Sequence, residues 1–336
     1  MNNKAPSNYL LPPHTRNSDT TSSIMRDVLF ALVPILIFAT VYFGYRALLI
    51  AGISCAAAVL SEYLWQKLSR KKVSILDCSA LLTGLFVAFN LPVSSPLWIP
   101  AIGSFFAIIF IKQLFGGLGR NLLNPALSAK LFLLLLFPAM MTRFEINGIQ
   151  IYTPLHHLAE GEYELLPSMM SCFLGVVPGD LGETSIVLIL LGGIYLCARR
   201  VIDLWIPACY VAVVFILSYI LGGNGMYEIL TGGLIFAAFF MATDYTTSPM
   251  TRTGRIVFGL GCGLLTTLLR FYGNYEIAIC VSVLIMNILT PLIDRLLPPR
   301  SFGKTSGGDR GLTSFVRSIP ERTAGLFRKK AVREEP

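Results

Sequence analysis

Long apolar stretches, separated by short polar connections, occupy most of the chain between residues 27 and 293. The ten stretches are residues 27–45, 47–65, 78–93, 97–115, 124–142, 184–198, 204–221, 229–244, 254–272 and 276–293. Most approach the roughly 20 apolar residues that cross a bilayer as a helix. The short stretches 78–93 and 184–198 are typical of broken membrane helices. The pattern predicts an all-α polytopic membrane protein with about ten transmembrane helices.

The composition agrees with this prediction. Charged residues make up 14% of the chain and hydrophobic residues 54%, whereas a soluble domain carries about 25% charged residues. An ordinary soluble protein and a disordered one are therefore excluded. The net charge of +8 is explained by basic cytoplasmic loops next to membrane lipid, so no nucleic-acid partner is expected. The first 26 residues are polar, and no cleaved signal peptide is expected.

The positive charges orient the predicted helices. With a cytoplasmic N-terminus, 24 of the 27 Lys and Arg residues lie on the cytoplasmic side, and only Arg46, Arg143 and Arg270 lie outside. The opposite orientation would break the positive-inside rule. Both termini are therefore expected in the cytoplasm (N-in/C-in). Glu62 and Asp77 come near cytoplasmic ends of their segments and are expected to be interfacial.

Two short motifs occur twice in the chain. Leu82-Thr-Gly84 matches Leu230-Thr-Gly232, and Asn121-Leu-Leu-Asn-Pro125 is similar to Asn287-Ile-Leu-Thr-Pro291. Matches this short also arise by chance. If they are real, five helices per copy make the second copy inverted, and inverted repeats place a functional pathway at their interface. The predicted parts are a cytoplasmic segment 1–26, a first five-helix repeat 27–142, an extracytoplasmic loop 143–183, a second five-helix repeat 184–294 and a basic cytoplasmic tail 295–336.

The seven cysteines are widely spaced. No two are closer than twelve residues, so the chain contains no CxxC motif and no zinc or iron–sulfur site is predicted. Cysteines in apolar segments usually pack as small hydrophobic residues. We therefore predict no metal site.

Three polar motifs interrupt the apolar pattern. They are Gly116-Gly-Leu-Gly-Arg-Asn-Leu-Leu-Asn-Pro-Ala126, Pro178-Gly-Asp-Leu-Gly-Glu-Thr-Ser185 and Phe240-Met-Ala-Thr-Asp-Tyr-Thr-Thr-Ser-Pro249. Because of these motifs, the chain resembles the RnfD/NqrB family of ion-translocating electron-transport membrane proteins. The resemblance covers about residues 10–303. The family comprises RnfD, which belongs to the Rnf complex, a membrane ferredoxin:NAD oxidoreductase, and NqrB, which belongs to the sodium-pumping NADH:quinone reductase. The Gly-Glu-Thr-Ser sequence and the lack of a long N-terminal extension favour RnfD.

The resemblance implies that Thr184 carries FMN through a phosphoester bond on the extracytoplasmic side. A flavin transferase would recognise the flavinylation loop formed by Asp180, Gly182, Glu183 and Ser185. The chain departs from NqrB here, which has Ser-Gly-Ala-Thr in place of Leu-Gly-Glu-Thr. From the residues alone, Thr184 is expected to cap a helix. A phosphate there would also face the positive end of the helix dipole, with Ser185 as the alternative acceptor or the remaining cap.

The resemblance also implies a second, non-covalent flavin, which is riboflavin. The amides of Asn121 and Asn124 in the Gly-rich motif suit the polar edge of a flavin, although a tight turn with close helix packing explains the same glycines. Asp244 ends the eighth segment. An acid at membrane depth indicates an ion or flavin contact, whereas in the headgroup region it would be a solvated helix-end carboxylate.

The resemblance therefore implies a flavin-carrying protein that relays electrons within a complex and couples this to Na⁺ or H⁺ transport, without stand-alone catalysis. Its partners would be the other Rnf proteins (RnfA, RnfB, RnfC, RnfE and RnfG), the flavin transferase and membrane lipid. Its location would be the inner membrane of a prokaryote. Three alternatives stay open: a flavin-free channel with the fold of urea or ammonium channels, a structural scaffold, and NqrB of the Na⁺-translocating quinone reductase.

Overall fold

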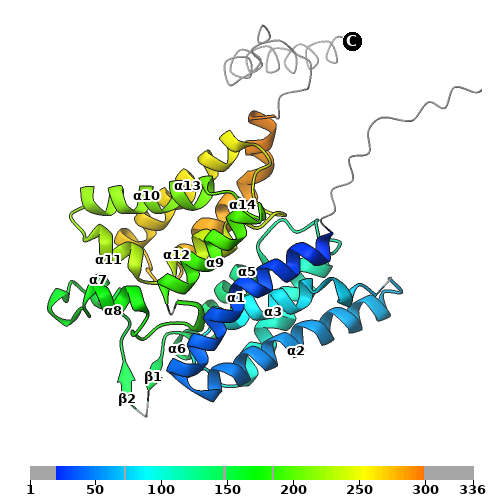
Figure 1. Ribbon diagram of the computed structural model, residues 1–336, viewed down its shortest axis with the longest axis horizontal. Helices are drawn as coiled ribbons and strands as arrows, with labels where there is room; N and C mark the ends of the chain where they lie inside the picture. Colours follow the sequence, from blue (N-terminus) through cyan, green and yellow to red (C-terminus); the bar gives the residue numbers. More distant parts are fainter. Residues whose placement is uncertain (1–19, 72, 147–148, 184, 299–336) are drawn as a thin grey trace, which may run out of the picture.

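The structure is a computed structural model that describes residues 20–71, 73–146, 149–183 and 185–298. Thr184 and most of the predicted segments 1–26 and 295–336 therefore lie outside the described residues. Within the described part the chain is helical (Figure 1), which confirms the all-α prediction. The α-helices are α1 Thr21–Phe43, α2 Tyr45–Leu68, α3 Ser79–Phe89, α4 Trp98–Phe106, α5 Pro125–Leu136, α6 Pro138–Met141, α7 Pro154–Ala159, α8 Met169–Leu174, α9 Ile186–Ala198, α10 Trp205–Ile220, α11 Gly225–Leu230, α12 Leu234–Phe236, α13 Arg252–Tyr272 and α14 Ala278–Leu296.

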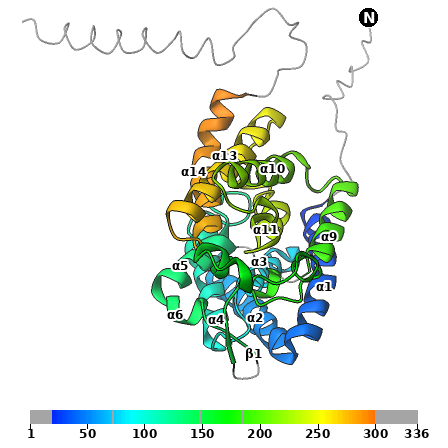
Figure 2. The same cartoon turned by 90° about the vertical axis from the view of Figure 1, so that its left-hand side faces the viewer.

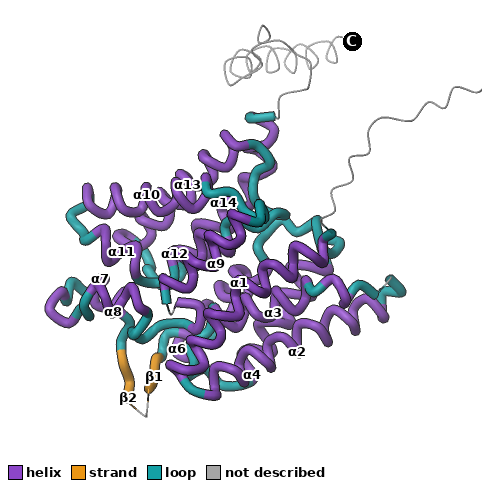
Figure 3. The backbone as a smooth tube through the Cα atoms, viewed as in Figure 1, coloured by secondary structure: helices purple, strands orange, loops and turns teal. Residues whose placement is uncertain are grey.

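Shorter elements complete the description. π-Helical turns continue α4 over Ala107–Gln113 and α12 over Ala237–Met241, and 3₁₀ turns span Ile75–Asp77, Tyr163–Leu165 and Leu181–Glu183. A hairpin of β1 (Phe144–Ile146) and β2 (Ile149–Ile151) is antiparallel, with Phe144 opposite Ile151. The hairpin, orange in Figure 3, projects from one end of the helical body. It lies within the loop 143–183, for which no secondary structure was predicted.

Each of the ten apolar segments contains helix, but their lengths differ. Among the described residues, α1, α2, α13 and α14 are long and apolar enough to cross a membrane, and five other apolar helices have 10–17 residues. The segment 229–244 is broken, because α11 ends at Leu230 and α12 begins at Leu234. Gly232 and Gly233 stand in the break with φ of +65° and +69°, a backbone conformation that glycine adopts without a steric penalty.

Side-chain caps fix where several helices begin. Thr20 accepts a hydrogen bond from the backbone N–H of Ser23 before α1, and Thr251 accepts one from Gly254 before α13. Such caps satisfy backbone donors that the first helical turn leaves unpaired. The helix starts are therefore encoded locally.

Packing divides the chain into two groups of helices. In the first group α2 packs against α3 and α4, and in the second α10 packs against α13, and α13 against α14. Contacts that join the groups include α1 with α9, which lie side by side in Figures 1 and 2, and α5 with α14. Small residues allow close approach, since a Cβ on Gly263 of α13 would lie 2.9 Å from the carbonyl oxygen of Tyr210 in α10.

Candidate functional site

A pocket with about 760 Å³ of empty space, its open mouth included, lies between the two groups of helices. Its walls are largely apolar and include the rings of Phe86, Phe239 and Phe240. Ligand pockets usually combine such walls with a few polar groups that orient the ligand. The polar side chains that line it include Ser79, Thr83, Lys112, Asn121, Asn124 and Asp244. The pocket thus brings together Asn121, Asn124 and Asp244, which the sequence analysis selected from two separate motifs.

Asn124 has a structural role at the pocket. Its Oδ1 caps α5 by accepting from the backbone N–H groups of Ala126 (3.0 Å) and Leu127 (3.2 Å), and Pro125 occupies the first helical position. Its Nδ2 donates to the carbonyl oxygen of Met241, 3.1 Å away on the second π-helical turn. Asn124 therefore ties the two groups of helices together at the pocket wall.

Asn121 has an unsatisfied polar atom. The residue is 7% exposed, and its Oδ1 has no hydrogen-bond partner in the described part of the chain. Leaving a buried acceptor unpaired costs about 1–3 kcal/mol. A ligand with an N–H donor, such as the polar edge of a flavin ring, would fit this position.

Asp244 lies in the loop after the second π-helical turn. Its Oδ2 accepts a hydrogen bond from Thr246 Oγ1 at 3.0 Å. Burial raises the pKa of Asp244 above its ordinary value, and hydrogen bonds from Thr246 and Thr247 oppose the shift. The pocket therefore offers a carboxyl group that is held in place by the hydroxyl of Thr246.

The loop 180–183, which the sequence analysis predicts to be recognised by a flavin transferase, is held by the first group of helices. Asp180 is 4% exposed, and its Oδ2 accepts from Lys130 Nζ of α5 at 2.7 Å. The backbone N–H of Leu181 donates to the carbonyl oxygen of Leu91 at 3.1 Å. Gly182 lies so close to α3 that a Cβ there would be 2.8 Å from Phe89 Cβ. The loop therefore has a defined position.

Glu183 faces the same lysine. Its Oε1 lies 3.6 Å from Lys130 Nζ. It also packs against the helix break, since a Cβ on Gly233 would lie 2.7 Å from Glu183 Oε1. Burial and the nearby Asp180 carboxylate raise the pKa of Glu183 to about 7, against the opposing effects of Lys130 and Arg270. Glu183 therefore links the loop 180–183 to the break between α11 and α12.

The residue that would follow the FMN acceptor begins α9. Ser185 is buried and occupies the N-cap position of α9, but its side chain makes no capping hydrogen bond. Thr184 lies outside the described residues. The flanking residues nevertheless place the start of α9 beside the loop held by Lys130.

Two further buried ion pairs were not predicted from the sequence. Arg270 at the end of α13 donates to Glu228 Oε2 at 2.7 Å and to the carbonyl oxygen of Thr231 at 3.2 Å, bracing the helix break. Lys112 donates to Glu62 Oε2 at 2.7 Å. Glu62, expected to be interfacial, is 1% exposed and enclosed by protein.

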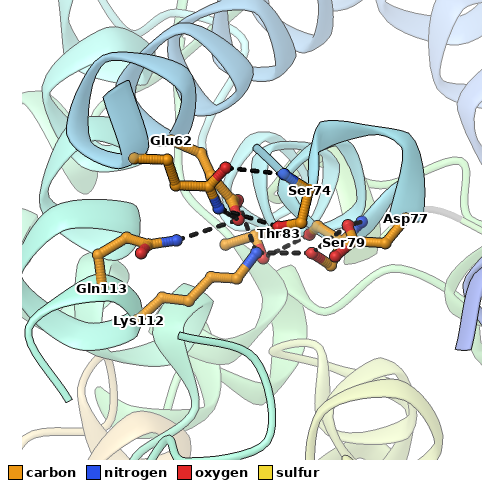
Figure 4. A network of polar contacts seen from close by, with 8 residues as sticks. Glu62, Ser74, Asp77, Ser79, Thr83, Lys112 and Gln113 are labelled. Atoms are coloured by element: carbon orange, nitrogen blue, oxygen red, sulfur yellow. Dashed lines mark hydrogen bonds and ion pairs between the residues drawn. The ribbon is translucent and has the colours of Figure 1, made fainter. Parts of the chain in front are cut away.

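A polar network surrounds the Lys112–Glu62 pair (Figure 4). Lys112 also donates to Ser79 Oγ at 2.7 Å, and Gln66 and Gln113 each donate to Glu62 Oε1 at 3.0 Å. Lys112 and Gln113 end the first π-helical turn. A lysine inside an otherwise apolar segment was the available signal, because charges there are costly and indicate function.

Comparisons with known proteins identify the same family over most of the chain. The model of the NQR2, RnfD, RnfE family matches residues 10–303. The chain is 41% identical over 299 residues to the D component of the Na⁺-translocating ferredoxin:NAD⁺ oxidoreductase complex of Acetobacterium woodii, covering 87% of this chain and 94% of that protein. It is 39% identical over 312 residues to the D component of the proton-translocating ferredoxin:NAD⁺ oxidoreductase complex of Clostridium ljungdahlii, covering 87% and 94%. The D component of an ion-translocating oxidoreductase complex from Stutzerimonas stutzeri is 37% identical over 335 residues, covering 85% and 93%.

Proposed function

Because the chain belongs to the NQR2, RnfD, RnfE family, we propose that it is the D component of an ion-translocating ferredoxin:NAD⁺ oxidoreductase complex, as its relatives are named. In this role it carries electrons on two flavins and assembles with the other Rnf proteins in a prokaryotic inner membrane. The relatives include both a Na⁺- and a proton-translocating complex, so either ion is compatible with the proposal. Bound flavins would supply the electron transfer.

One observation carries the electron-transfer proposal: the pocket unites Asn121, Asn124 and Asp244 beside three aromatic rings. The unpaired Oδ1 of Asn121 supports a ligand with an N–H donor, as riboflavin has. Phe86, Phe239 and Phe240 would bind the apolar part of the ring. Asn124 and Asp244 would hold the polar side of the pocket in place.

FMN on Thr184 is the second part of the proposal. The fastened positions of Asp180, Gly182 and Glu183 support it, because a covalent carrier must keep a fixed distance to its electron partners. A phosphate at the start of α9 would face the positive end of that helix. In the proposed topology, both termini are cytoplasmic and Thr184 is extracytoplasmic.

The proposed inverted repeats gain support from the helix contacts. The first helices of the two halves, α1 and α9, pack together, and so do the last helices, α5 and α14. Such contacts between equivalent helices are what a twofold relation between the halves would produce. The flavin pocket would then lie at the interface of the repeats, where such folds place their functional sites.

The test is ultraviolet in-gel fluorescence of the denatured chain, produced with its flavin transferase. Wild type and Ser185→Ala are expected to fluoresce, and Thr184→Ala to be dark. Fluorescence retained in Thr184→Ala would move the acceptor elsewhere. A dark wild type would refute the covalent carrier, and if acid also extracts no flavin from the native complex, a flavin-free channel or a scaffold takes its place.

A further inference from the structure

A buried cation stands at the wall of the proposed flavin pocket. Lys112 and Asp244 are the charged side chains among the described residues that line it. Lys112 is 1% exposed. Burying an unpaired ammonium group is very costly, so its retention here requires compensating partners.

Lys112 has two hydrogen-bond partners, one that lines the pocket and one outside its described lining. Nζ donates to Glu62 Oε2 and to Ser79 Oγ, each at 2.7 Å. An ammonium group has three N–H donors, and within the described part of the chain one of them is left for a ligand. Ser79 and Lys112 line the pocket, whereas Glu62 is not among its described lining residues. Lys112 therefore forms part of the pocket wall, and its counter-ion Glu62 lies outside the described lining.

The network holds this arrangement in place. Glu62 Oε1 accepts from Gln66 and Gln113, both at 3.0 Å. The Ser79 hydroxyl accepts from Lys112 and donates to Asp77 Oδ1 at 2.6 Å. Figure 4 shows Glu62 of α2, Ser79 of α3 and Lys112 of the first π-helical turn converging. A charge fixed in this way acts on a ligand without the cost of reorganising.

We propose that Lys112 is a positioning residue that raises the reduction potential of the non-covalent flavin, and that Glu62 moderates this effect; the inference rests on the proposed function of the pocket. Reduction by two electrons and one proton leaves one additional negative charge on a flavin ring. A fixed positive charge at the pocket wall favours that product over the neutral oxidised ring. The electrons come from the neighbouring redox centres of the complex.

The test is a redox titration of the acid-extractable flavin in the purified complex, followed by absorbance. Lys112→Met is expected to disfavour two-electron reduction at least tenfold, which lowers the potential by about 30 mV. Glu62→Gln, which leaves the lysine less neutralised, is expected to raise it. Lys112→Arg keeps the charge and should behave as wild type, and the double variant Glu62→Gln/Lys112→Met should fall between the single variants.

The directions of the shifts in reduction potential distinguish an electrostatic role of Lys112 from a structural one. Unchanged potentials in Lys112→Met and Glu62→Gln, or shifts in the same direction, would overturn the proposal, because disturbed packing has no reason to produce opposite signs. If Lys112→Met fails to assemble, Glu62→Gln decides: a raised potential supports the proposal, and an unchanged or lowered one overturns it. Absence of extractable flavin from the wild type would instead refute the pocket's proposed function.

Discussion

Lys130 Nζ lies 2.7 Å from Asp180 Oδ2, which fastens the middle of α5 to the loop that leads into α9. The two residues are 50 positions apart, and their side chains are 14% and 6% exposed. The same ammonium group lies 3.6 Å from Glu183 Oε1. One cation from the first group of helices therefore pairs with Asp180 and lies close to Glu183, both beside the proposed FMN acceptor.

Replacing Lys130 with Met should release this loop. The change leaves Asp180 buried without its counter-ion, and breaking a buried pair from one side costs about 3–5 kcal/mol. We expect a lower melting temperature of the purified protein and a large loss of covalent flavin by in-gel fluorescence. Lys130→Arg, which keeps the charge, should retain most of both. Wild-type fluorescence and melting in Lys130→Met would contradict the role of the pair.

Gly182→Ala should disturb the same loop sterically. Its Cβ would meet Phe89 Cβ at 2.8 Å and the Phe89 carbonyl oxygen at 2.9 Å, and overpacking of this kind costs about 1–3 kcal/mol. Covalent flavin and melting temperature should both fall. The matched control is Gly52→Ala in α2, where a Cβ meets nothing within 4 Å, so melting should be unchanged or slightly higher. Equal behaviour of the two variants would rule out the close contact.

The sequence predicted the helices well because apolar stretches must be buried in lipid or protein, whatever their neighbours. It could not predict that Asn121 and Asp244 share a pocket, because hydropathy does not say which helices meet. Lys112 and Arg270 were used only as charges that set the topology, Lys112 on the cytoplasmic side and Arg270 outside, and the structure shows both paired and buried. Their partners, Glu62 and Glu228, are 50 and 42 positions away along the chain. The sequence pattern does not show which residues this far apart come into contact in the fold.

Glu183 should make the stability of the protein depend on pH. Burial and Asp180 raise its pKa from 4.5 to about 7, so the folded state holds a proton that the unfolded state has released. Its contribution is fully present below about pH 4.5 and is lost as the pH rises through about 7. The melting temperature should therefore fall between pH 5 and pH 8.

Glu183→Gln provides the control for this pH dependence. The neutral amide should flatten part of the decline between pH 5 and pH 8. Glu276, whose pKa burial and Asp180 also raise to about 7, should account for a further part. An identical slope in wild type and Glu183→Gln would show that Glu183 does not hold the proton.

Asn124→Ala should destabilise the fold. It removes the cap of α5 and the hydrogen bond to the Met241 carbonyl oxygen, and losing an N-cap side chain costs about 0.5–2 kcal/mol. Thermal melting in detergent should detect this loss even in preparations stripped of non-covalent flavin. Asn124→Ser, which can still cap the helix, should recover part of the difference. A flavin-free Asn124→Ala protein as stable as the wild type would contradict the capping role.

Asn121→Ala should separate ligand binding from stability. Its Oδ1 makes no hydrogen bond in the described part of the chain, so truncation removes a buried unpaired acceptor and should leave the flavin-free protein as stable as the wild type or more so. The same change removes the partner for a flavin N–H, and acid-extractable flavin should fall at least fivefold. Quantifying extracted flavin by fluorescence, beside melting temperatures, checks both expectations. Full flavin content in Asn121→Ala would mean that the unpaired oxygen does not face the ligand, whereas a large loss of stability would mean that Asn121 supports the pocket wall as Asn124 does.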